Sequence, residues 1–233
     1  MPPRGGAFTG IVASAGTTVP ADPAPLVLYN FEEWPSVSRG THTVASIACA
    51  LDPGDPRDTT QAKFGGASVH RATQVTFAAP LALLGDFAIQ FWVRWPTGTA
   101  EGFVFALDNM YLQFYVGHPD VLYYTTTAGY SAILYIANRS DVNSGDTPAL
   151  GDDQWHHVSV QRSAGYLAVY LDGTLWSDPN ANAYFPDPVT ATATGLQLAS
   201  GGFGGWIDDF RIVDGRASLR VPIAPYPPFV PPL

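Results

Sequence analysis

The feature that most constrains the fold is a nine-residue run of strictly alternating side chains that begins at Phe87 and ends at Trp95. In an extended strand, successive side chains point to opposite faces, so one set of residues lines each face. One set is apolar throughout and consists of Phe87, Ile89, Phe91, Val93 and Trp95. The pattern therefore predicts a half-buried strand in an antiparallel sheet.

Further strand signals follow along the chain. Residues 155–162 also alternate, residues 166–171 are predicted to form the return strand, and Asp172-Gly173 marks a tight hairpin because this pair tolerates positive φ. Later strands are expected at residues 195–198 and 206–213. No convincing amphipathic helix is found. Short strands separated by turns predict an all-β sandwich or barrel.

Composition agrees with this prediction and narrows the function. Charged residues make up 13% of the chain, against about 25% in typical globular proteins. The net charge of −9 argues against binding to nucleic acid or to an anionic membrane surface. No apolar run approaches the roughly 18 residues that a membrane span requires, so membrane insertion is not expected.

Processing signals and cysteine content suggest where the chain folds. Its N-terminus, residues 1–6, does not lead into an apolar signal core. Cys49 is the single cysteine, so no intrachain disulfide can form. Both observations favour synthesis and folding in a reducing cytoplasm.

The chain divides into three parts. Residues 1–25 are small, polar and proline-rich, and are expected to form an extended N-terminal arm. Residues 26–220 are expected to form the β domain. Residues 221–233 contain too many prolines for a helix or a central strand, and are expected to form an extended C-terminal tail.

Three segments resemble the laminin-G-like, concanavalin A-like jelly rolls that are common in bacteriophage tail and virion proteins. The first joins the Phe-Gly-Gly-Ala-Ser of residues 64–68 to the strand at residues 85–93. The second runs from Trp-His-His-Val to the Asp-Gly turn, residues 155–173. The third, residues 205–217, begins Gly-Trp-Ile-Asp-Asp-Phe-Arg-Ile and is similar to phage proteins in particular. Order and spacing match over roughly residues 60–230.

This resemblance implies an antiparallel jelly-roll sandwich and suggests two functions. One is a bacteriophage virion structural protein: a decoration, head-fibre or tail-associated module, made in the host cytoplasm and built into the virion. Its arm and tail would dock to other virion proteins, with a homo-oligomer and adhesion to a host-surface polysaccharide as further expectations. The alternative is a stand-alone carbohydrate-binding, lectin-like module.

A calcium site is one interpretation of the acidic residues. Asp208 is expected to share a sheet face with the core residue Phe210, where a carboxylate needs either a cation or backbone N–H donors. Asp86 is the proposed second ligand, with Asp108 as a further candidate. The resemblance weakens here, because residues 69–75 lack the acid that family members often carry. A structural, hydrogen-bonded Asp208 without any cofactor remains the other interpretation.

Catalytic motifs are missing, so the chain is predicted not to be an enzyme. The glycosidases of this fold use a Glu-x-Asp-x-x-Glu strand, whereas glutamate occurs here only at Glu32, Glu33 and Glu101. Adjacent His156 and His157 should point to opposite faces of a strand, so they cannot chelate one ion together.

Aromatic residues exceed what the predicted core faces need. Exposed aromatic rings stack on sugars or anchor protein interfaces. The candidates for contact with a glycan or a partner, expected in or beside loops, are Tyr123, Tyr124, Tyr130, Trp176, Tyr184 and Phe185. Packing within the sandwich is the alternative explanation for these residues.

Overall fold

The computed structural model describes residues 26–29, 31, 44–49, 57–70, 72–83, 85–96, 102–108, 110–114, 120–125, 131–136, 152–163, 166–175 and 192–214. Within these ranges the regular secondary structure consists of β-strands, with no helix. No helix in this part of the chain is long and apolar enough to cross a membrane. The predicted arm (residues 1–25) and tail (residues 221–233) lie outside the described residues.

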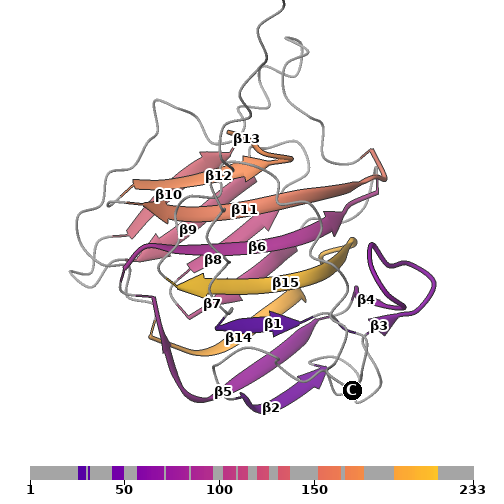
Figure 1. Ribbon diagram of the computed structural model, residues 1–233, viewed down its shortest axis with the longest axis horizontal. Coiled ribbons are helices and arrows are strands. Elements are labelled where there is room, and N and C mark those ends of the chain that lie inside the picture. The colour runs from indigo at the N-terminus through magenta and orange to yellow at the C-terminus, as the bar shows by residue number, and fades with distance from the viewer. Residues whose placement is uncertain are drawn as a thin grey trace, which may run out of the picture.

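The strands form two antiparallel sheets, which we name sheet A and sheet B. Sheet A has the order β13 (Thr174–Leu175), β12 (Tyr166–Leu171), β11 (Trp155–Ser163), β6 (Phe87–Arg94), β15 (Trp206–Asp214), β4 (Ser68–Val69) and β3 (Arg57–Asp58), and β1 (Val27–Tyr29) also pairs with β15. Sheet B has the order β10 (Ser131–Ile136), β9 (Asp120–Thr125), β8 (Met110–Phe114), β7 (Gly102–Leu107), β14 (Thr192–Ser200), β5 (Thr73–Ala82) and β2 (Val44–Cys49). In Figure 1, strands β6, β11 and β15 lie in front of β7, β8 and β9.

The two sheets pack face to face around one apolar core. Phe91 of β6 and Phe210 of β15 stack with their ring centroids 5.9 Å apart, and Phe105 of β7 contacts both rings from the opposite sheet at 5.9 Å. All three side chains are fully buried. This arrangement confirms the predicted antiparallel jelly-roll sandwich.

Strand β6 confirms the alternating run from which the fold was predicted, with one correction. Its predicted core residues are all buried, but Gln90 on the other face is buried as well. The Gln90 and Gln161 amides both donate hydrogen bonds to the Ser159 hydroxyl, at 3.3 and 3.0 Å. The first half of β6 is therefore covered on both faces, and only Trp92 and Arg94 are partly exposed.

The predicted Asp-Gly hairpin is also confirmed. Asp172 and Gly173 have φ values of 48° and 81°, and join β12 to β13 with Leu171 paired to Thr174. Two positive φ values are what a type I′ turn requires. The Asp-Gly sequence therefore accounts for the connection between β12 and β13.

Strand β15 departs from simple alternation, and the prediction that Asp208 shares a face with Phe210 is wrong. Asp208 pairs with Trp92, whereas Arg211 pairs with Gln90, so β15 has an extra residue at this point. Asp209 has a φ of 46° within this β-bulge. A β-bulge adds one residue to one strand, so the alternation of faces shifts by one position beyond it. Phe210 therefore points into the core, while Asp208 lies on the outer face of sheet A.

Candidate functional site

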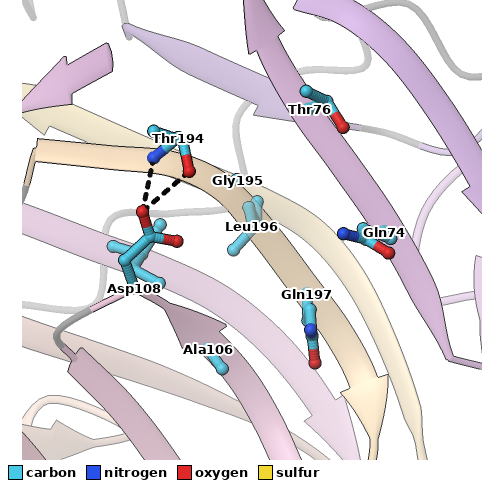
Figure 2. A pocket seen from close by; sticks show the side chains of 9 residues that line it. Gln74, Thr76, Ala106, Asp108, Thr194, Gly195, Leu196 and Gln197 are labelled. Carbon is cyan, nitrogen blue, oxygen red and sulfur yellow. Dashed lines mark hydrogen bonds between the residues drawn. The ribbon is translucent and has the colours of Figure 1, made fainter.

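An open depression of about 350 Å³ lies on the outer face of sheet B. Alternation along its strands explains the polar lining: Val75, Leu196 and Leu198 are buried in the core, so Gln74 and Gln197 project to the other side and are exposed. Figure 2 shows the lining residues, which come from β5, β7 and β14 and the turn after β7. They are Gln74, Thr76, Ala106, Leu107, Asp108, Thr194, Gly195, Leu196 and Gln197.

Small residues create the hollow. Ala106 pairs with Gln197, and Gly195 pairs with Thr76, so two small residues lie between longer polar side chains. Gly195 follows a register shift in the β14–β5 ladder. A Cβ atom at Gly195 would lie 3.0 Å from the Val75 carbonyl oxygen, which leaves little room for a side chain.

The rim of the depression holds one carboxylate. Asp108 Oδ2 accepts hydrogen bonds from the backbone N–H and the hydroxyl of Thr194, both at 2.8 Å (Figure 2). These contacts fix Asp108 at the turn that follows β7. None of the lining residues is cationic, and the chain carries a net charge of −9. Electrostatics at this face therefore favours a neutral ligand over an anionic one.

Asp208, the predicted calcium ligand, anchors a loop of the backbone. Its Oδ2 atom accepts the N–H groups of Lys63 and Phe64 at 2.8 and 2.9 Å, and its Oδ1 atom accepts that of Asp209 at 2.7 Å. The side chain is only 1% exposed. Burial raises its pKa to about 7, although these three hydrogen bonds act in the opposite direction. This geometry supports the structural interpretation of Asp208.

The acidic residues predicted as metal ligands lie apart. Asp86 precedes β6, whereas Asp208 pairs with Trp92 six residues further on. At about 3.3 Å per residue, the two positions are about 20 Å apart along the strand. Asp108 lies on sheet B and is bonded to Thr194. Within the described ranges, no three His, Cys, Asp or Glu side chains gather in a way that could hold a metal ion.

The adjacent histidines lie on opposite faces, as predicted, because His156 pairs with Val93 and His157 pairs with Trp92. The His156 ring is 2.7 Å from Asp172 and 3.0 Å from Asp152, and these carboxylates raise its pKa. His157 is buried against the Trp92 ring, and burial lowers its pKa to about 4. These contacts with other residues of the fold indicate a structural role for both histidines.

The predicted aromatic contacts are only partly described. Tyr123 and Tyr124 lie within strand β9, not in a loop, and pair with Tyr111 and Met110 of β8. Tyr130, Trp176, Tyr184 and Phe185 lie outside the described residues. The polar side chains of the depression were not among the site residues predicted from the sequence. The alternating Thr-Gln-Val-Thr-Phe of residues 73–77 was the available signal for them.

The chain belongs to the concanavalin A-like lectin/glucanases superfamily. A laminin-G-type family model with that description matches residues 68–219. This match covers strands β4 to β15, which include the three strands that line the depression, whereas β1, β2 and β3 precede it. No curated protein sequence matches the chain.

Solved structures with the same fold are distant in sequence. The binding domain of botulinum neurotoxin serotype D has a TM-score of 0.58 at 12% identity, covering 82% of this chain and 47% of that one. The binding domain of Paraclostridial Mosquitocidal Protein 1 has a TM-score of 0.54 at 11% identity, covering 82% and 49%. This chain thus spans about half the length of the toxin binding domains that it matches.

A third structure matches over nearly its whole length. It is domain 4 of AbnA, a GH43 extracellular arabinanase from Geobacillus stearothermophilus, solved in complex with arabinotriose. The TM-score is 0.55 at 17% identity, with 82% of this chain and 93% of that one covered. These likenesses establish the shared fold.

Proposed function

We propose that this chain is a non-catalytic carbohydrate-binding module that binds a neutral glycan in the depression of sheet B. One observation carries the proposal: the exposed amides of Gln74 and Gln197 are register partners beside the small residue Ala106. Each amide offers both donors and acceptors. Such groups match sugar hydroxyls, which also donate and accept.

The family and the fold support a carbohydrate ligand. The superfamily takes its name from lectins and glucanases, and the arabinanase domain of the same fold was solved with an arabinose trisaccharide. Fold-level likeness alone is weak evidence for function. The polar lining and the lack of a cation in the depression supply the local argument.

Binding without hydrolysis is proposed because the depression contains one carboxylate. Most glycosidases place two carboxylic groups about 5–9.5 Å apart across the scissile bond. Asp108 is the only acid among the lining residues, and its Oδ2 atom is occupied by Thr194. A bound glycan would therefore meet no second carboxylate within this depression.

The test is calorimetric titration of the full-length protein with neutral oligosaccharides, using Gln74→Ala/Gln197→Ala as the binding variant. Each lost hydrogen bond contributes about 1 kcal/mol net, so the double variant should weaken binding roughly 10- to 100-fold. Gln154→Ala is the matched control, because Gln154 is an exposed glutamine in the turn before β11 of sheet A. Equal affinities for all three proteins would overturn the proposed site.

We further propose that the module works in a bacteriophage particle, where it is a decoration, head-fibre or tail-associated protein. The support is the likeness of residues 205–217 to phage proteins, together with the proline-rich segments at residues 1–25 and 221–233. The proposed partners are neighbouring virion proteins and a host-surface polysaccharide. Antibody against the purified chain should label particles released when the source bacterium lyses. Unlabelled particles would overturn the virion proposal and leave the glycan proposal intact.

A further inference from the structure

An aromatic pair lies on the same outer face of sheet B, beside the depression. Phe103 of β7 and Tyr111 of β8 pack with their ring centroids 5.1 Å apart and their planes at 86°. Both side chains are half-buried. Tyr111 pairs with Ala106, which lines the depression, so the aromatic pair and the depression are neighbours on one surface.

A β-bulge turns Phe103 out of the core. Phe103 pairs with Gln113 and Phe105 pairs with Leu112, so β7 has one more residue than β8 between these two pairs. Val104 is the extra residue, and both Val104 and Phe105 are fully buried. Without the bulge, Phe103 would share the core face of Phe105. Bulges often re-aim a side chain next to a functional site.

A glycine makes room for this ring. A Cβ atom at Gly201 would lie 2.6 Å from Cδ2 of Phe103. Gly201 also has a φ of 64°, which residues other than glycine rarely adopt. Two separate backbone features therefore place Phe103 beside Tyr111: the bulge in β7 and the glycine turn after β14.

A row of register partners on the outer face of sheet B links the two glutamine amides to Tyr111 and crosses four adjacent strands. Gln74 pairs with Gln197, Gln197 with Ala106, and Ala106 with Tyr111. Neighbouring strands are about 4.8 Å apart, so the row spans about 14 Å. One sugar ring cannot contact both ends of it.

We propose that Phe103 and Tyr111 form a stacking platform that binds the apolar face of a sugar ring, as a second subsite of the same glycan-binding face. This inference rests on the proposed function. The ligand is then a neutral oligosaccharide whose chain runs across the strands, from the platform to the Gln74 and Gln197 amides. The perpendicular packing of the two rings orients the platform before the ligand arrives, which lowers the entropic cost of binding.

The chemistry at both ends of the row selects the class of ligand. Aromatic rings favour contact with the C–H face of a sugar, and the amides favour hydroxyl groups. Asp108 and the absence of cationic lining residues disfavour sialylated, sulfated and uronic sugars.

The experiment titrates the full-length protein with a homologous series of neutral oligosaccharides of increasing length. The variants are Tyr111→Ala, Tyr111→Phe, which keeps the ring, and Tyr170→Ala as a matched control. Tyr170 is a half-buried tyrosine on the outer face of β12 in sheet A. Comparison across lengths separates stacking at the platform from hydrogen bonding in the depression.

We expect Tyr111→Ala to weaken binding of the long oligosaccharides about tenfold and to leave binding of the short ones unchanged. Tyr111→Phe and Tyr170→Ala should bind every length as the wild type does. If Tyr111→Ala binds all lengths as the wild type does, or weakens all of them equally, the platform is overturned while the depression remains. If the wild type binds no neutral oligosaccharide, the proposed function itself fails, and the platform with it.

Discussion

Replacing Asp208 by asparagine removes a buried titratable carboxyl group while preserving the shape of the side chain. The wild-type carboxylate accepts the N–H groups of Lys63, Phe64 and Asp209, so it joins the loop at residues 61–66 to strand β15. Asparagine can accept through one oxygen only, and its NH₂ group would face a backbone donor. The variant also cannot take up a proton at this position, so the stability difference between the two proteins should change with pH.

The difference should depend on pH with a defined sign. Burial raises the pKa of Asp208 from 3.8 to about 7, so the folded protein binds a proton between these values that the unfolded chain releases. A raised carboxyl pKa stabilises the folded state at low pH, and this contribution declines as the pH rises through about 7. Since one pKa unit corresponds to about 1.4 kcal/mol, the decline amounts to about 4 kcal/mol.

Urea denaturation of both proteins at a series of pH values from 4 to 8 measures this effect. The quantity of interest is the free energy of unfolding of the wild type minus that of Asp208→Asn, which cancels the other titrating groups. It should be largest near pH 4, fall as the pH rises to about 7, and level off by pH 8. A difference that is constant, or that rises with pH, would refute the account of Asp208 as a desolvated carboxylate.

Three further predictions concern single positions. Ala106→Leu should fill the depression and weaken glycan binding at least about tenfold, with circular dichroism confirming the fold; unchanged affinity would place the ligand elsewhere. Gly201→Ala should lower the free energy of unfolding by about 1–2 kcal/mol, because alanine is strained at a φ of 64° and its Cβ would meet Phe103. The raised pKa of His156 gives stability below the unfolded value of 6.5 that is lost as pH rises through the folded pKa, so His156→Gln should destabilise more at pH 5.5 than at pH 9 in urea titrations. Equal destabilisation at both pH values would contradict the contacts with Asp152 and Asp172.

Sequence patterns predicted the parts of the fold that local chemistry controls. Alternation identified β6, and the Asp172-Gly173 pair identified a hairpin whose two residues both have positive φ. Such features depend on neighbouring residues and can be recognised in one segment. The sandwich architecture followed from their repetition along the chain.

The bulges could not be predicted in the same way. Asp209 adopts positive φ although it is not glycine, and the extra residue at Val104 is buried like its neighbour. Their positions depend on how each strand pairs with distant strands, which alternation within one strand does not reveal. The face of Asp208 was predicted wrongly for this reason.

The depression was missed for a related reason. Gln74 and Gln197 are 123 residues apart in sequence, and pairing between β5 and β14 brings them together. An alternating polar residue in one strand indicates an outward face, but not which other polar residues share it. The contact residues predicted from the sequence were aromatic side chains in or beside loops, whereas two of those tyrosines lie in β9.

The most direct test of the glycan-binding account is NMR mapping of backbone amide signals during titration with a neutral oligosaccharide. The account predicts shifts gathered at Gln74, Ala106, Tyr111, Thr194 and Gln197, with sheet A signals unchanged. Shifts confined to sheet A, or no shifts with any neutral glycan, would contradict it.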